Sequence, residues 1–436
     1  MTALSTPAPH RRLTRDDTRT LFLASLGGAL EFYDFIVYVF FAATIGKLFF
    51  PPGTAGWVEQ LQTYGIFAAG YLARPLGGII MAHFGDTTGR KRMFTLSVFM
   101  MALPTLLIGL MPTYVTIGYA APVLLLIMRI FQGAAIGGEA PGAWVFVSEH
   151  VPSNRVGLAC GLLTGGLTGG ILLGSLMATG VNTAYTPVEI LAWAWRIPFL
   201  VGGVFGFVAM FLRRWLHETP VFEAIRARKA TSQRPLGQVL RDHRGAVAVS
   251  MLITWMLTAA IVVVILMTPT LMQKLYSIAP TKTLIGSVAA TLALTASVIL
   301  TGALLDRFGA LPVVLIGGPA LIGSTYALFL GTAANPDHLV PLYALAGFCI
   351  GMTAVVPYVM VRSFPSVVRF TGVSFSYNVA YAVFGGLTPV AVPLLLRYNR
   401  LNPAHYVAFT VVVGVVAVVV NATRGTSHEP GSTAVE

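Results

Sequence analysis

The chain has 436 residues, of which 56% are hydrophobic and only 10% are charged. Soluble proteins carry a charge on about a quarter of their residues, so this composition excludes an ordinary soluble protein and indicates several membrane-spanning helices. The net charge of +12 does not require a nucleic-acid partner, because 20 of the 28 Lys and Arg residues fall in segments predicted to be cytoplasmic, as the positive-inside bias of membrane proteins predicts.

The chain begins with a polar segment, residues 1–20, that contains four arginines. The apolar run that follows is longer than the core of a signal peptide and contains acidic residues. We therefore expect this run to be retained as the first span and not to be cleaved.

In total the chain has twelve apolar runs, this one included, and each is near the roughly 20 residues that a helix needs to cross a bilayer. The predicted spans are 21–46, 63–84, 93–111, 118–141, 156–180, 192–212, 246–268, 283–305, 311–331, 339–361, 370–396 and 403–421. The largest polar segment, 213–245, separates a six-helix bundle at 21–212 from a second one at 246–421, and a short tail, 422–436, ends the chain. The distribution of Lys and Arg predicts that both termini and this central loop are cytoplasmic.

The second and third spans are joined by eight polar and glycine residues, Gly85–Arg92. Three consecutive cations at 90–92 predict that this connection is cytoplasmic. We expect Gly85 and Gly89 to allow a tight turn, and Asp86 to meet the N-terminus of the following helix or an arginine of the loop. The alternative is a solvated charged turn without a further role.

Polar residues at the span ends repeat between the two halves. Asp86 after the second span corresponds to Asp306 after the eighth, and Arg155 before the fifth span corresponds to Arg369 before the eleventh. Two six-helix bundles related by a parallel repeat are the architecture of many secondary transporters, which hold their substrate between the halves near the midplane.

A series of short stretches adds a more specific signal. They are Glu31-Phe32-Tyr33-Asp34-Phe35, Arg74-Pro75-Leu76-Gly77-Gly78, Gly85–Arg92, Arg129-Ile130-Phe131-Gln132-Gly133, Gly137-Gly138-Glu139, Trp195-Arg196-Ile197-Pro198-Phe199, Glu218-Thr219-Pro220, Tyr377-Asn378 and Phe384-Gly385-Gly386. In this order and spacing they resemble the metabolite:proton symporters of the major facilitator superfamily. The resemblance implies a twelve-helix fold and import, with protons, of a small carboxylate or a compatible solute.

Within that family the chain is most similar to the citrate and tricarboxylate branch, in its length, its short tail and residues 116–126 and 385–396. The long C-terminal coiled coil of the osmosensing branch has no counterpart here. Ala140 stands where the family usually has an aromatic residue, which leaves the substrate open. The connection that begins at Asp306 lacks the family's usual pair of arginines, which predicts a weaker cytoplasmic gate in the second half.

Six ionisable residues lie within or at the edge of the predicted spans. They are Glu31, Asp34, Glu139, Arg74, Arg129 and Arg196. A charge in hydrocarbon costs several kcal/mol, so such residues usually face a cavity or a partner. Counting about 1.5 Å per residue from the cytoplasmic ends places all but Glu139 and Arg196 near mid-depth.

We predict that Arg74 and Arg129 bind the carboxylates of the substrate and that Asp34 or Glu31 carries the coupled proton. Desolvation and a nearby arginine have opposite effects on the proton affinity of a carboxylate, so substrate binding would be linked to proton binding. The alternative is that Glu31–Arg129 and Asp34–Arg74 are static ion pairs.

Other polar residues are expected to act as gates or as neutral ligands. Glu139 lies nearer the cytoplasm than Arg129 and is predicted to be a gate or packing residue. Arg196 is predicted to be an interfacial or structural residue. The residues expected to hold the cytoplasmic ends of the halves together are Asp86, Arg90, Lys91, Arg155, Asp306 and Arg369.

The spans of the second half are almost uncharged, so its substrate ligands are expected to be neutral. We predict Tyr377 and Asn378, since an amide within a span requires a hydrogen-bond partner. Further candidates, which more often serve packing, are Thr254, Trp255, Thr258, Tyr358 and Tyr381. The glycines between Gly165 and Gly174 are expected to allow close helix packing.

No pattern indicates an enzyme. Cys160 and Cys349 lie in apolar spans and predict no disulfide framework, no histidine lies deep in a span, and neither a metal-ligand cluster nor a phosphate-binding loop is present. We expect no cofactor, no metal and no nucleic-acid partner, and a functional monomer in a bacterial inner membrane. A symporter for proline or betaine and an uncoupled facilitator or exchanger stay open as alternatives.

Overall fold

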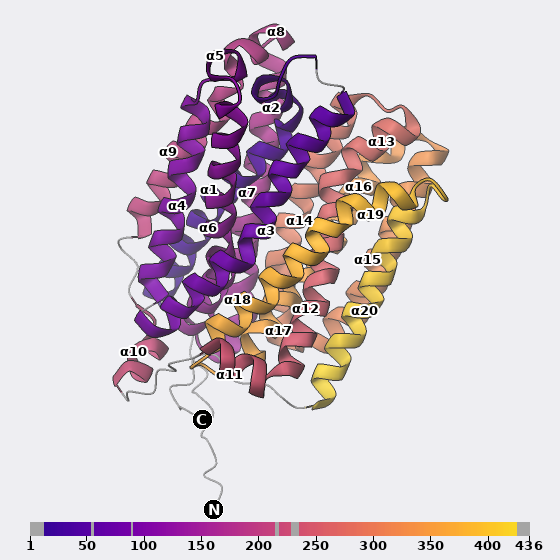
Figure 1. Ribbon diagram of the computed structural model, residues 1–436. Coiled ribbons are helices and arrows are strands. Elements are labelled where there is room, and N and C mark those ends of the chain that lie inside the picture. The colour runs from indigo at the N-terminus through magenta and orange to yellow at the C-terminus, as the bar shows by residue number, and fades with distance from the viewer. Residues whose placement is uncertain (1–12, 54–55, 89, 214–217, 228–234, 425–436) are drawn as a thin grey trace, which may run out of the picture.

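The computed structural model describes residues 13–53, 56–88, 90–213, 218–227 and 235–424, which form helices and contain no strand (Figure 1). Nine of these helices are long and apolar enough to cross a membrane, and a bent pair makes a tenth. The two other predicted spans are occupied by α3 (Gly56–Thr88) and α4 (Arg90–Leu110). The predicted all-α membrane fold is confirmed. The division at 21–212 and 246–421 stays a prediction.

The first half contains the helices up to the central loop. They are α1 (Arg15–Phe40), α2 (Ala42–Phe49), α3, α4, α5 (Tyr114–Ile117), α6 (Ala120–His150), α7 (Val156–Ala184), α8 (Pro187–Glu189) and α9 (Arg196–Arg213). A capping box explains why α1 begins before the predicted residue 21: Thr14 Oγ1 accepts from the Asp17 backbone N–H at 3.2 Å, and Asp17 Oδ2 accepts from the Thr14 N–H at 2.8 Å.

Short helices α10 (Pro220–Ala227) and α11 (Pro235–Asp242) mark the end of the molecule drawn at the bottom of Figure 1, called here the central-loop end. The second half follows. Its helices are α12 (Arg244–Ala259), α13 (Thr268–Tyr276), α14 (Pro280–Phe308), α15 (Ala310–Ala334), α16 (Leu339–Ile350), α17 (Val355–Ser363), α18 (Arg369–Ala380), α19 (Gly386–Leu395) and α20 (Asn402–Arg424). A π-helical segment, Tyr381–Gly385, joins α18 to α19, and such segments occur frequently at functional sites.

The expected turn at Gly85 is wrong, whereas the expected turn at Gly89 falls on a residue outside the described ones. Helix α3 continues to Thr88 and α4 starts at Arg90, so helix flanks residue 89 directly. A Cβ atom on Gly85 would overlap the ring of Phe370. Glycine at this position therefore allows close packing between α3 and α18, and its freedom to turn is not used.

The halves meet along two helix pairs, α7 with α14 and α3 with α18. Glycines allow the close approach: a Cβ on Gly161 would lie 2.8 Å from the Val298 carbonyl of α14, and a Cβ on Gly166 or Gly170 would overlap carbonyls of α1. The predicted packing role of the glycines of α7 is confirmed, except at Gly169, where a Cβ would meet nothing within 4 Å.

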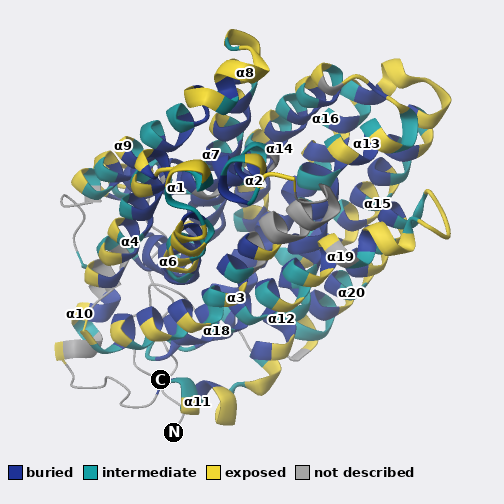
Figure 2. Cartoon of the chain, turned by 45° about the horizontal axis from the view of Figure 1, so that its top comes forward, coloured by how far each residue is buried: buried dark blue, intermediate teal, exposed yellow. Residues whose placement is uncertain are grey.

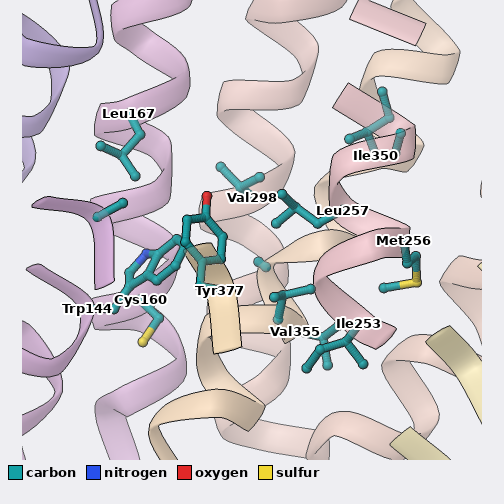
Figure 3. Packing of buried hydrophobic residues seen from close by; sticks show 14 of the residues in the cluster. Trp144, Cys160, Leu167, Ile253, Met256, Leu257, Val298, Ile350, Val355 and Tyr377 are labelled. Atoms are coloured by element: carbon teal, nitrogen blue, oxygen red, sulfur yellow. The ribbon is translucent and has the colours of Figure 1, made fainter. Parts of the chain in front are cut away.

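A continuous apolar core fills the space between these pairs. In Figure 3, Trp144 of α6 and Leu167 of α7 lie across from Leu257 of α12, with Tyr377 of α18 between them. Figure 2 shows that buried residues occupy the inner faces of the helices, while exposed ones concentrate at the ends and on the outer faces. The side chains of Asp34, Arg74, Arg129 and Asn378, described next, are enclosed in this apolar interior.

Candidate functional site

Arg74, near the middle of α3, is 1% exposed and lies in a cluster of tyrosines. Its guanidinium carbon is 5.5 Å from the ring centroid of Tyr71, 5.5 Å from that of Tyr377 and 4.2 Å from that of Tyr381. The rings of Tyr71 and Tyr381 are stacked, with centroids 5.9 Å apart. A cation over aromatic faces is attracted by the ring quadrupoles, so the cluster partly offsets the cost of burying the charge.

One donor group of Arg74 is unused. Nε donates to Asn378 Oδ1 at 3.4 Å, whereas Nη2 has no hydrogen-bond partner in the described part of the chain. A buried donor without an acceptor costs free energy. The site therefore presents a buried, positively charged donor that an anion could satisfy.

Asn378 joins the two halves beside Arg74. Its amide donates to the Gly137 carbonyl of α6 at 2.6 Å and to the Ser374 carbonyl at 2.9 Å, and Ser374 Oγ donates to the Gly78 carbonyl of α3 at 3.0 Å. A Cβ on Gly78 would overlap this amide. The structure thus brings the predicted ligands Arg74, Tyr377 and Asn378 together.

Arg129 of α6 lies in a separate polar cluster. It is fully buried, its guanidinium carbon is 4.1 Å from the ring centroid of Tyr38, and Nη1 donates to Gln132 Oε1 at 2.8 Å. Gln132 Nε2 in turn donates to Thr105 Oγ1 of α4 at 2.6 Å. Sequence reasoning noted Gln132 only as part of a motif and missed Thr105, because a lone threonine in a span carries no signal.

Asp34 does not face Arg74. It is fully buried, and neither of its carboxylate oxygens has a hydrogen-bond partner among the described residues. It packs on α9, where a Cβ on Gly202 would overlap Asp34 Oδ1 and a Cβ on Gly206 would lie 3.3 Å from Oδ2. The alternative of a static Asp34–Arg74 ion pair is therefore wrong in this conformation, because α1 directs Asp34 toward α4 and α9. The side chain of Glu31 lies outside the described residues, so the Glu31–Arg129 pair stays a prediction.

Two aspartates cap helices of the opposite half at the central-loop end. Asp86 Oδ2 accepts from the backbone N–H and the hydroxyl of Thr371, at 2.9 and 2.8 Å, in the first turn of α18. Asp306 accepts from the Gly157 and Leu158 N–H groups, at 2.6 and 2.9 Å, in the first turn of α7. A carboxylate is stabilised at a helix N-terminus. The described contacts of Asp86 join it to a helix that comes 285 residues later. The expected contact with the following helix or with an arginine of the connection stays a prediction, because the side chain of Arg90 lies outside the described residues.

The two arginines related by the repeat differ. Arg369 is fully buried and its Nη1 lies 2.9 Å from Glu149 Oε1 of α6, with both side chains inaccessible to solvent. Arg155 is exposed. Next to Arg155, a contact between the two halves is made by Arg362 of α17, whose Nη2 donates to the Ser153 carbonyl at 2.9 Å. Glu149 was missed by sequence reasoning, because the predicted fourth span ended at residue 141, whereas α6 continues to His150.

Glu139 and Arg196 make their described contacts within the first half. Glu139 is 2% exposed and Oε2 accepts from Ser97 Oγ of α4 at 2.6 Å, within the first half. Arg196 Nη1 donates to the carbonyls of Gly109 and Met111, at 2.9 and 2.7 Å, which ties α9 to the end of α4. Arg90 begins α4, and its side chain, like that of Lys91, lies outside the described residues.

The model of the Major Facilitator Superfamily matches residues 24–389. This chain belongs to that superfamily. It is 31% identical over 407 residues to a putative proline/betaine transporter of Staphylococcus haemolyticus, covering 92% of this chain and 87% of the relative. It is 30% identical over 397 residues to a citrate-proton symporter of Klebsiella pneumoniae, covering 90% and 88%.

Among solved structures, the proton:xylose symporter XylE bound to 6-bromo-6-deoxy-D-glucose superposes with a TM-score of 0.80 at 14% identity, covering 96% of this chain and 97% of that one. This likeness shows the fold. As a member of the Major Facilitator Superfamily, the chain is a multi-pass membrane transporter and not an enzyme, as its sequence predicted.

Proposed function

We propose that this protein is a symporter that imports a small organic anion together with protons by alternating access, with a di- or tricarboxylate such as citrate as its substrate. The unsatisfied guanidinium of Arg74 carries the proposal. A carboxylate of the substrate would accept from Nη2, and a charge-assisted bond of this kind is about twice as strong as a neutral one.

The tyrosines around Arg74 favour an anion over a substrate cation. Aromatic cages bind quaternary ammonium groups, and some relatives are named as proline/betaine transporters. Here the rings of Tyr71, Tyr377 and Tyr381 surround the chain's own guanidinium. A second cation in this cluster would meet a like charge, so a zwitterion could bind there only through its carboxylate.

Asp34 is the proposed proton carrier. Ionisable groups within spans mark ion and proton pathways, and Asp34 has neither an ion-pair partner nor a hydrogen-bond donor among the described residues. A carboxyl group in such a position can gain or lose a proton without first breaking a salt bridge. Glu31 is the second candidate.

The contacts at the central-loop end are the proposed gate. Asp86, Asp306 and the Glu149–Arg369 pair each join one half to the other, so all of them must break before this end can open. Under the predicted topology this end faces the cytoplasm, and the conformation is closed on that side. Arg90 and Arg155 are proposed to contribute positive charge to the gate, and Glu139 to stabilise α6 against α4.

The proposed location is the plasma membrane of a bacterium, with both termini in the cytoplasm. The proposed functional unit is a monomer that is surrounded by lipid. Its proposed partners are the substrate and protons.

Uptake into proteoliposomes tests the function. The panel contains labelled citrate, other di- and tricarboxylates, proline and betaine, each with and without an inward proton gradient. We expect gradient-dependent accumulation of one di- or tricarboxylate by the wild type. Asp34→Asn should retain exchange but not accumulate, while Asp16→Asn, which changes an exposed aspartate of the same helix, should behave as the wild type.

Two results contradict the proposed substrate or its coupling to protons, and a third contradicts the role of Asp34. Accumulation of proline or betaine but of no carboxylate would support the compatible-solute alternative. Transport that never exceeds equilibrium under a proton gradient would support a facilitator. If Asp34→Asn accumulates substrate normally, the proton is carried elsewhere, and Glu31→Gln is the next variant.

A further inference from the structure

A chain of hydrogen bonds leads from Arg129 toward Asp34 across three helices. Arg129 and Gln132 lie on α6, Thr105 on α4 and Asp34 on α1. All four side chains are fully buried. The bond from Arg129 to Gln132 is 2.8 Å, that from Gln132 to Thr105 is 2.6 Å, and Thr105 Oγ1 donates to the Met101 carbonyl at 2.9 Å.

The chemistry of the groups sets the direction of this chain. Arginine can only donate, so Gln132 must present its oxygen to Arg129 and its NH₂ group to Thr105. Thr105 Oγ1 must then accept from Gln132. The hydroxyl hydrogen of Thr105 is the one donor in this chain whose acceptor is not fixed by the other bonds.

Two acceptors lie within reach of that hydroxyl. One is the Met101 carbonyl, which it binds in this structure. The other is the carboxyl group of Asp34: a Cβ on Gly202 would overlap Asp34 Oδ1 and lie 3.0 Å from Thr105 Cγ2, so both side chains rest on the same face of α9. Neither oxygen of Asp34 has a hydrogen-bond partner in the described part of the chain.

We propose that Thr105 and Gln132 are positioning residues that link the protonation of Asp34 to Arg129. When Asp34 releases its proton to water, the Thr105 hydroxyl turns from the Met101 carbonyl to the new carboxylate and keeps its own hydrogen. A hydroxyl that donates to a charged group accepts more strongly, because hydrogen bonds in a chain polarise one another. Gln132 is thereby held more firmly against Arg129. This inference rests on the proposed function in taking Asp34 as the proton carrier.

The other titratable groups around Asp34 are occupied or more distant. The hydroxyl of Tyr33 donates to the Pro198 carbonyl at 3.0 Å, and the ring of Tyr38 packs on Arg129. On α6, Glu139 accepts from Ser97, and on α9 Arg196 donates to the carbonyl of Gly109 at the end of α4 and to that of Met111 just after it. The side chain of Glu31 is not among the described ones. Of the residues whose contacts are described, Thr105 is the one whose hydroxyl lies within hydrogen-bonding reach of the Asp34 carboxylate.

Infrared difference spectroscopy of the purified full chain, titrated with pH without substrate, tests the link. The carbonyl stretch of the protonated Asp34 is identified as the band that Asp34→Asn removes. Thr105→Val should let Asp34 keep its proton about tenfold more tightly, a shift of about one pH unit, and should change the band frequency. Gln132→Leu should change both in the same sense by about threefold. Thr105→Ser retains the hydroxyl and should restore the wild-type titration.

Thr325→Val is the matched control. Thr325 is also fully buried and donates to the carbonyl four residues earlier, at 2.7 Å, but it lies on α15 in the other half; its variant should titrate as the wild type. If Thr105→Val and Gln132→Leu both leave the band and its titration unchanged, the inference is overturned. Should Thr105→Val fail to fold, Gln132→Leu alone decides.

The inference and the proposed function fail separately. If no band disappears in Asp34→Asn, Asp34 does not titrate, and both the link and the assignment of the proton are wrong. If the bands behave as expected but no carboxylate of the uptake panel accumulates, the link stands and the proposed substrate is wrong.

Discussion

The buried pair of Glu149 and Arg369 offers the sharpest test of the gate. Its atoms lie 2.9 Å apart, and neither side chain is accessible to solvent. Removing one partner of a buried pair leaves the other charge uncompensated and costs about 3–5 kcal/mol. Glu149→Gln retains an acceptor for Arg369, so we take the lower value. Because the pair joins the two halves, this cost falls on the closed conformation alone.

About 3 kcal/mol corresponds to a shift of about 100-fold toward the open state, at 1.4 kcal/mol per factor of ten. The rate at which the thiol of Cys160 in α7 reacts with a labelling reagent measures how often the protein is open. This thiol is fully buried and lies close enough to Asp306 and Arg362 to interact with their charges. In a Cys349→Ala background, we expect the rate of thiol labelling at Cys160 to rise by about two orders of magnitude in Glu149→Gln.

The controls separate gating from general damage. Glu189→Gln changes an exposed carboxylate in α8, at the opposite end of the molecule, and should leave the labelling rate unchanged. The double variant Glu149→Leu/Arg369→Met replaces the pair by apolar side chains and should restore slow labelling, as such replacements often do. If Glu149→Gln labels as slowly as the wild type, the pair does not hold the gate closed.

Three further predictions concern the site and its supports. Arg74→Lys should lower carboxylate uptake by proteoliposomes at least tenfold, because an ammonium group cannot present the planar fork of a guanidinium; unchanged uptake would remove Arg74 from the substrate site. Asp86→Asn should speed Cys160 labelling by about tenfold, since a neutral amide loses the charge-assisted part of the helix cap, and an unchanged rate would count against that cap. Gly202→Ala places a methyl group against Asp34 Oδ1 and should abolish proton-driven accumulation, whereas Gly169→Ala, in open space, should not; equal activity of the two would refute the placement of Asp34.

The gate shows how a sequence repeat can hide a structural difference. Asp86 and Asp306 occupy equivalent positions and make equivalent helix caps, as their repeat suggested. Arg155 and Arg369 are also related by the repeat, yet of the two only Arg369 forms a salt bridge within the described part of the chain, while Arg155 interacts with the charge of Asp306. Near Arg155 the described contacts are a hydrogen bond from Arg362 to the Ser153 carbonyl and the helix cap made by Asp306. The weaker gate expected in the second half stays a prediction.

The sequence by itself determined the class of fold, because the free energy of burying an apolar run in a bilayer depends mainly on its composition and length. The same reasoning found Asp34, Arg74 and Arg129, since a charge in hydrocarbon is conspicuous wherever it occurs. It also singled out Asn378, an amide that required a partner.

Only the tertiary structure decided which of these groups meet. Asp34 and Arg74 are both predicted near mid-depth, but the rotation of α1 directs Asp34 toward Gly202 of α9. The packing of α3 against α18 places Arg74 beside Asn378 and the tyrosines. Glu149 and Arg369 are 220 residues apart and form a pair only because α6 and α18 pack together. Helix rotation and pairing depend on how distant surfaces fit, often through a single glycine, and a local pattern along the chain does not contain that information.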